Sequence, residues 1–357
     1  MSGLKQLRTR MNTVSSTMKI TTAMKMISVS KLRKSHDALF KAYPYADEID
    51  RMVRRLVRAA SFRQEQMLAE NKTETLSLPL LLTGREEEKK FLIVAVMSDE
   101  GLCGLFNQTI IAKVEQMIDF LQQEDKKISL LCFGKRGGDI LKRKHPDMNI
   151  HITSKRTDLS AFGEAERLAY TLIDSFYSGI FDACAVVYSE FESAAVQKIT
   201  IEQIVPIQTF NHENRWQFLI DSKDPVYVKR DVLGQKKMAM QQTPLFTAIA
   251  GQNIRSPLGA IDAQNLLQEG TRPADAYDYD PDEVVILENI LPLYIQSYIY
   301  KVLLDTTASE SASRMLAMDN ASRNANDMMT QLKKTYHRKR QELVTRDLIE
   351  VVAGSSS

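Results

Sequence analysis

The chain has 357 residues and a formal net charge of +2, with 47 basic and 45 acidic side chains. This near balance excludes a uniformly cationic nucleic-acid binder, and the length together with 44% hydrophobic residues allows about two domains with cores of their own. Three widely spaced cysteines, Cys103, Cys132 and Cys184, predict reduced thiols instead of a disulfide framework. Apolar runs all fall short of the roughly 18 residues that a membrane-spanning helix needs.

The N-terminal region reads as a very long helix, because residues 4–43 contain neither Gly nor Pro. Its first apolar residues have the alternating spacing of three and four that a coiled-coil seam requires: Leu4, Leu7, Met11, Val14 and Met18. After Met18 the apolar residues slip in phase to Ile20, Met24 and Ile27. Pro44 is expected to kink or interrupt the helix before a charged helical stretch at 47–67.

The charge is unevenly distributed, because residues 1–36 contain eight basic residues and no acidic one. The first basic segment also has the composition of a mitochondrial targeting peptide, but a helical pattern running to about residue 40 favours a structural helix. A second basic segment near the other end consists of Lys333, Lys334, Arg338, Lys339 and Arg340. Two basic helical segments predict an acidic partner surface, whether protein, phosphate or membrane.

A central α/β domain is predicted at 91–206, after a polar linker at 71–90 that holds a short apolar island at 78–82. Strands that alternate with helices form βαβ units, so we expect a Rossmann-like, largely parallel sheet covered on both faces. The predicted strands are 91–97, 128–133, 183–189 and 196–206, and the predicted helices are 107–123, 135–144 and 163–177.

Residues 211–279 break this alternation and read as an insertion. Trp216 lies in a strand-like run at 215–220. This run is expected to pair with residues 226–229 as a hairpin. The remainder of the insertion is rich in Pro and Gly.

The C-terminal region is predicted to be a second long helix that opens near Pro281, with Asp280 as its cap. Pro292 is expected to kink it, and residues 293–353 contain no further Gly or Pro. Apolar residues recur with heptad spacing at Met329, Leu332, Tyr336 and Leu343. Lys339, however, falls where this seam requires an apolar residue. A chain that leaves its domain as a helix at both ends is expected to pair the two helices as a coiled coil.

Signatures of catalysis are absent from the sequence, which lacks the P-loop, the GxSxG turn, CxxC and any metal-ligand spacing among its five histidines. The GKRGGD segment at 134–139 has two interpretations, a nucleotide-binding loop and a turn that starts a helix, and the pattern favours the turn. Cys103 also has two interpretations, a reactive thiol and a small residue packed under a turn, and the packed residue is favoured. We therefore predict no cofactor, no metal and no catalytic residue.

Several motifs in order along the chain resemble the gamma subunit of the rotary ATP synthase, the central stalk of that complex. Glu100 and Leu105 depart from the pattern of that family, which has Arg and Gly there. The motifs are KITTAMKMISVSKL at 19–32, SDEGLCGLFN at 98–107, SESASRMLAM at 309–318, the segment 320–326 and RQELVTRDLIEVVAG at 340–354.

The resemblance implies that the terminal segments, 1–70 and 281–357, form an antiparallel coiled coil. Between them in the sequence lie the α/β domain at 91–206 and an insertion at 207–280. It implies that the helices turn inside a ring of alpha and beta subunits, while the α/β domain contacts the c-subunit membrane ring and the epsilon subunit. The chain would transmit torque for coupled ATP synthesis and proton transport without catalysing the reaction. It would lie peripherally on the cytoplasmic side of a bacterial inner membrane.

The insertion lies where chloroplast relatives carry a redox-regulated segment, but none of the three cysteines falls in 211–279, so a regulatory dithiol is excluded there. Two interpretations of the insertion stay open, a hairpin that hinders reverse rotation and a loop without such a role.

The resemblance also implies contacts with the beta subunits. The basic residues of this set are expected to meet acidic loops of beta, and Gln341 and Thr345 to hydrogen-bond with its catch loop. The set comprises Met24, Lys25, Arg314, Arg340, Gln341, Thr345 and Glu350.

Two other functional classes remain as alternatives. A basic coiled-coil nucleic-acid-binding protein would explain the two basic segments, but no aromatic stacking pattern accompanies them. An α/β enzyme with helical dimerisation arms would explain the architecture, but the sequence offers no site for it.

Overall fold

The computed structural model describes residues 2–69, 78–85, 87–155, 160–207 and 283–355. These residues divide into two compact units. The first comprises 1–31, 102–104 and 311–357, and the second comprises 32–101 and 105–310. The expected insertion at 211–279, with its hairpin, and the expected cap Asp280 lie outside the described residues.

The second unit contains a five-stranded sheet with the order β3-β2-β1-β4-β5. All neighbouring pairs are parallel except β4 and β5, which are antiparallel, so the predicted largely parallel sheet is confirmed. One strand, β3, was not predicted, because it is a five-residue edge strand with little apolar content. The strands are β1 Lys90–Val96, β2 Lys127–Phe133, β3 Asn149–Thr153, β4 Ala183–Phe191 and β5 Gln197–Val205.

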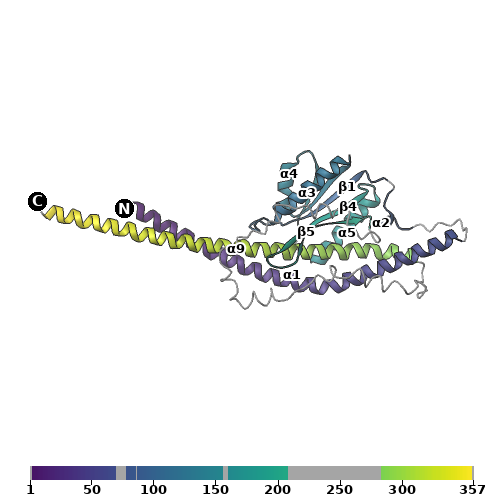
Figure 1. Cartoon of the computed structure of the whole chain (residues 1–357), viewed down its shortest axis with the longest axis horizontal. Coiled ribbons are helices and arrows are strands. Elements are labelled where there is room, and N and C mark those ends of the chain that lie inside the picture. Colours follow the sequence, from purple (N-terminus) through teal and green to yellow (C-terminus); the bar gives the residue numbers. More distant parts are fainter. Residues whose placement is uncertain (1, 70–77, 86, 156–159, 208–282, 356–357) are drawn as a thin grey trace. The chain divides into compact units, whose positions relative to one another are not determined.

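Helices cover both faces of this sheet, as predicted. Val94 and Val96 of β1 join a core that includes Leu172 and Phe176 of α5 and buried residues of the two long helices. Residues of β1 alternate between the faces, and α3 packs on the opposite side (Figure 1). The helices of the α/β domain are α2 Leu80–Thr83, α3 Phe106–Gln123, α4 Lys135–Lys144 and α5 Ala161–Tyr177.

The chain's two long helices are α1, Ser2–Ala69, and α9, Glu283–Ser355. The expected interruption at Pro44 is wrong, because α1 continues through it, and α9 likewise continues through Pro292. A proline inside a helix removes one backbone hydrogen bond and costs about 3 kcal/mol. Pro44 faces solvent, where water can satisfy the freed carbonyl, and buried residues on both sides of it hold the helix in place.

The coiled-coil seam of α1 keeps its phase in the first unit, so the predicted slip to Ile20, Met24 and Ile27 is wrong. After Met18 the buried polar positions are Thr21 and Ser28, and the half-buried Lys25 between them continues the spacing of three and four. Met24, next to Lys25, is half-buried as well. Ile27, by contrast, is 57% exposed. Polar residues can occupy the seam here because the facing helix supplies hydrogen-bond partners for them.

Candidate functional site: the paired terminal helices

The first unit pairs α1 and α9 in antiparallel orientation. The Thr21 hydroxyl lies 2.8 Å from the Ser322 hydroxyl, and Lys25 Nζ lies 2.6 Å from Asp319 Oδ1. Near the start of α1, a Cβ atom placed on Gly3 would lie 4.0 Å from Lys339 Nζ. Residue numbers thus rise along α1 as they fall along α9, which confirms the antiparallel coiled coil.

A polar layer crosses the seam where Thr21 and Lys25 face α9. The Asp319 carboxylate accepts hydrogen bonds from Lys25 across the seam and from Arg323 Nε, one turn further along α9, at 3.0 Å. Partial burial raises the pKa of Asp319, but the bonds from Lys25 and Arg323 outweigh it and hold the pKa below its ordinary value. The carboxylate therefore stays ionised at neutral pH, and the layer keeps its charges.

The last turns of α9 run beyond the start of α1. Because Gly3 lies opposite Lys339, the α9 residues beyond the first turn of α1 have no facing helix among the described residues of the first unit. Apolar side chains are exposed along this extension, which is typical of a surface that another protein covers. They are Val344, Leu348, Ile349, Val351 and Val352.

The structure places the predicted site residues in two groups. Met24 and Lys25 are half-buried on α1, whereas Arg340, Gln341 and Thr345 are exposed on α9. Lys25 faces Asp319, so the two groups are about 30 Å apart along α9 at 1.5 Å per residue.

Two further predicted site residues lie on α9. Arg314 is buried, with 5% of its surface exposed, and Glu350 belongs to the last turns of the helix. Sequence reasoning missed Asp319 and Ser322. A heptad continued without a slip would have placed Thr21 and Lys25 in the seam and pointed to polar partners on α9.

The α/β domain has a helix start that is already occupied by the chain's own carboxylate. Asp99 accepts hydrogen bonds from the backbone N–H of Lys135, the first residue of α4, at 2.9 Å and from that of Lys155 at 3.2 Å. Gly134 has φ of 127°, and a Cβ there would lie 2.4 Å from the Met97 carbonyl oxygen. The interpretation of GKRGGD as a turn that starts a helix is therefore confirmed.

The cysteines are free and buried. Burial raises the pKa of Cys132 to about 12 and raises that of Cys184 as well, so neither is a thiolate near neutral pH. Cys103 is also buried, in agreement with the packing interpretation. Among the described residues, no group of three or more His, Cys, Asp and Glu side chains is placed to hold a metal ion.

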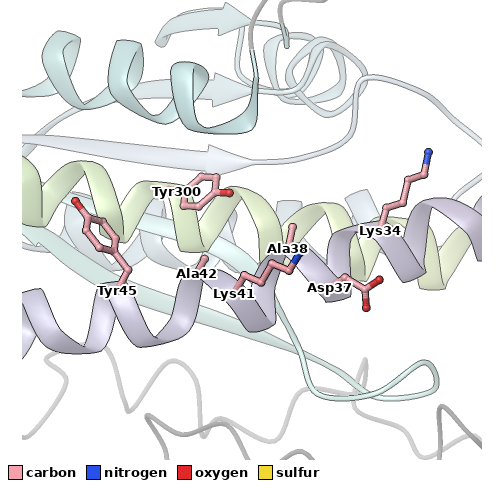
Figure 2. A pocket seen from close by; sticks show the side chains of 7 residues that line it. All are labelled: Lys34, Asp37, Ala38, Lys41, Ala42, Tyr45 and Tyr300. Atoms are coloured by element: carbon pink, nitrogen blue, oxygen red, sulfur yellow. The ribbon is translucent and has the colours of Figure 1, made fainter.

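A shallow groove of about 480 Å³ lies in the second unit, beside the part of α1 around Ala38 (Figure 2). Its charged side chains do not converge on one point, since the Lys34 ammonium and the Asp37 carboxylate point away from one another (Figure 2). The arrangement lacks the close nucleophile–base pair that covalent catalysis requires. The lining residues are Lys34, Asp37, Ala38, Lys41, Ala42, Tyr45 and Tyr300.

Within the described parts of the chain, no helix is both long enough and apolar enough to cross a membrane.

Comparison with known proteins identifies the family. The sequence profile described as ATP synthase matches residues 3–357. The ATP synthase gamma chain of Rhodospirillum rubrum is 32% identical over 358 aligned residues, and that of Parvibaculum lavamentivorans is 32% identical over 359; each alignment covers all of both chains. A chain of the Euglena gracilis mitochondrial ATP synthase, solved by cryo-electron microscopy, shares the fold at 16% identity, with a TM-score of 0.54 over 99% of this chain and 94% of its own. These relatives lend no support to the nucleic-acid-binding alternative, and the chain belongs to the ATP synthase gamma-chain family.

Proposed function

We propose that this chain is the central rotor stalk of an ATP synthase and transmits torque between an ion-driven membrane ring and a ring of alpha and beta subunits. The observation that carries the proposal is the antiparallel pair of α1 and α9, from which α9 extends with exposed apolar side chains. Such a surface fits the inside of a protein ring, which would cover the extension on all sides.

The mechanical role follows from two properties of the helices. A pair of helices fastened by hydrogen bonds and an ion pair resists twisting better than a single helix, so it can carry torque. Contacts with the ring must also be weak enough to break at each step, because a tight contact would favour one rotary state over the others. Exposed ion pairs, worth at most about 1 kcal/mol, meet this need.

For the contacts with beta we propose the set implied by family resemblance. Exposed Arg340 would meet acidic loops, and Gln341 and Thr345 would hydrogen-bond nearby. Met24 and Lys25 would form the second contact. Arg314 and Glu350 complete the set.

In this proposal the chain has no catalytic role of its own, and nucleotide chemistry takes place on the beta subunits, with alpha contributing. The α/β domain would contact the c-subunit ring and the epsilon subunit. The complex would hold the chain at the cytoplasmic face of a bacterial inner membrane. The bacterial gamma chains among its relatives support this location.

Co-purification from native membranes tests the proposal, with an affinity tag placed in the segment 211–279. We expect alpha, beta, epsilon and c subunits to be recovered with ATPase activity that the chain alone lacks. Recovery of the chain alone, or of nucleic acid with it, would contradict the stalk function.

A further inference from the structure

Lys25 is half of an ion pair that remains open to solvent. Its ammonium lies 2.6 Å from Asp319 Oδ1 across the seam, yet 35% of the Lys25 side chain and 20% of the Asp319 side chain are exposed. Arg323 binds the same carboxylate from one turn further along α9. One carboxylate therefore serves two cations, and an outside group can approach Lys25.

This arrangement allows the Lys25 ammonium to exchange Asp319 for another carboxylate. If an acidic group of a partner binds Lys25, Asp319 loses one cation but keeps Arg323, so no charge is left without compensation. One exposed ion pair is then replaced by another of similar strength, and the net change in free energy is small.

We propose that Asp319 is a positioning residue for Lys25. Its carboxylate competes with acidic groups of a partner for the Lys25 ammonium and so keeps the contact of Lys25 with those groups weak. The inference rests on the proposed stalk function and deepens it, because it explains how a cation in the seam can contact the ring without trapping one rotary state. A purely structural alternative is that the pair only holds α1 and α9 in register.

The pair itself is tested on the purified full-length chain by labelling with an amine-reactive reagent and peptide mass spectrometry. Replacing Asp319→Asn is expected to raise the labelling rate of Lys25 about two- to fivefold, the range for loss of an exposed pair. Asp327→Asn is the matched control, since Asp327 is an exposed carboxylate on the same helix. Lys19, which is exposed, serves as the internal reference. An unchanged rate at Lys25 in the Asp319→Asn variant would overturn the inference.

Competition is tested on the assembled complex by measuring ATP hydrolysis against ionic strength. Without Asp319 the contact of Lys25 with the ring should tighten, so Asp319→Asn is expected to slow hydrolysis at low salt and to match the unmodified complex at high salt, where exposed charges are screened. Asp327→Asn should not slow hydrolysis at either salt concentration. A rate that is unaffected at low salt, or reduced equally at all salt concentrations, would show a structural role alone and overturn the inference.

Two further variants separate charge from geometry. Asp319→Glu keeps the carboxylate and should restore the salt dependence of the unmodified complex; if it does not, charge is not the cause. The exchange Lys25→Asp with Asp319→Lys rebuilds the pair but moves the cation to α9, so we expect the salt dependence of hydrolysis to remain different from that of the unmodified complex. Full recovery by this exchange would mean that the pair only sets the register. Failure of the stalk proposal would look different, because the chain would then not assemble with alpha and beta, whereas the labelling result would be unaffected.

Discussion

At the scale of single residues, Asp305 of the second unit is an ionisable group held away from solvent. It is fully buried on α9, and its Oδ1 accepts a hydrogen bond from the backbone N–H of Phe191 at 3.5 Å. Its Oδ2 has no hydrogen-bond partner among the described residues. Lys301 on α9, Glu190 on β4 and Glu202 on β5 act on it electrostatically. Burial is the largest influence and raises the pKa of Asp305 to about 7, although Lys301 opposes this shift.

This shift predicts a stability that falls as pH rises. The folded chain holds a proton on Asp305 up to about pH 7, whereas the unfolded chain loses it near the ordinary pKa of 3.8. Stability due to this group is therefore fully present below about pH 4 and is lost between about pH 4 and pH 7. Asp305→Asn, which is neutral at every pH, should be more stable than the unmodified chain at pH 8, by at most about 4 kcal/mol, and similar to it at pH 4.

Thermal unfolding of both chains between pH 4 and pH 8 would measure this effect, with Asp327→Asn as the exposed control. A difference in melting temperature that stays constant across this range would contradict the prediction.

At the scale of elements, sequence patterns predicted best where one signal dominates. The predicted helix at 135–144 has the same bounds as α4, because Gly134 and the basic last turn mark its two ends. The predicted phase of α1 is wrong after Met18, because the apolar residues Ile20 and Ile27 are exposed and lie outside the seam. The seam instead holds Thr21 and Ser28, whose burial depends on a partner helix some 300 residues away in the sequence. No local pattern carries that information.

The corrected phase can be tested with two substitutions on the same helix. Leu32 continues the heptad after Ser28 and is 2% exposed, whereas Ile27 is mostly exposed. Leu32→Ala should destabilise the chain by about 2–4 kcal/mol, since it removes buried methyl groups and leaves a cavity. Ile27→Ala should change stability by no more than about 0.5 kcal/mol. Melting temperatures of the two purified variants would decide, and equal losses would mean that the seam follows the slipped phase after all.

At the scale of the whole molecule, the candidate contact surface was less predictable than the fold. Packing within the chain determines the sheet and the paired helices, and their patterns are written in the sequence. Exposed residues such as Gln341 and Thr345 carry no comparable pattern, because their neighbours would belong to other subunits. Family resemblance alone proposes their roles. The structure adds the Lys25–Asp319 pair, which places one proposed contact next to charges of the chain itself.

That neighbourhood leads to a prediction for coupling in the assembled complex. Met24 is half-buried beside Lys25, so Met24→Lys would place a second ammonium next to a cation whose carboxylate, Asp319, already binds Arg323. Among the described residues of this layer the added charge has no carboxylate of its own, so it should bind acidic groups of the ring instead. We expect a tighter contact, slower rotation and less ATP made per proton transported, with partial recovery at high salt.

Met26→Lys supplies the matched control, because Met26 is an exposed methionine two residues further along α1 and points away from the seam. Proton pumping and ATP turnover measured together in inverted membrane vesicles would give the coupling ratio for each variant. If Met24→Lys leaves that ratio unchanged, Met24 does not lie at a contact with the ring. If both variants lower it equally, added charge anywhere on α1 is sufficient, and the position beside Lys25 has no special role.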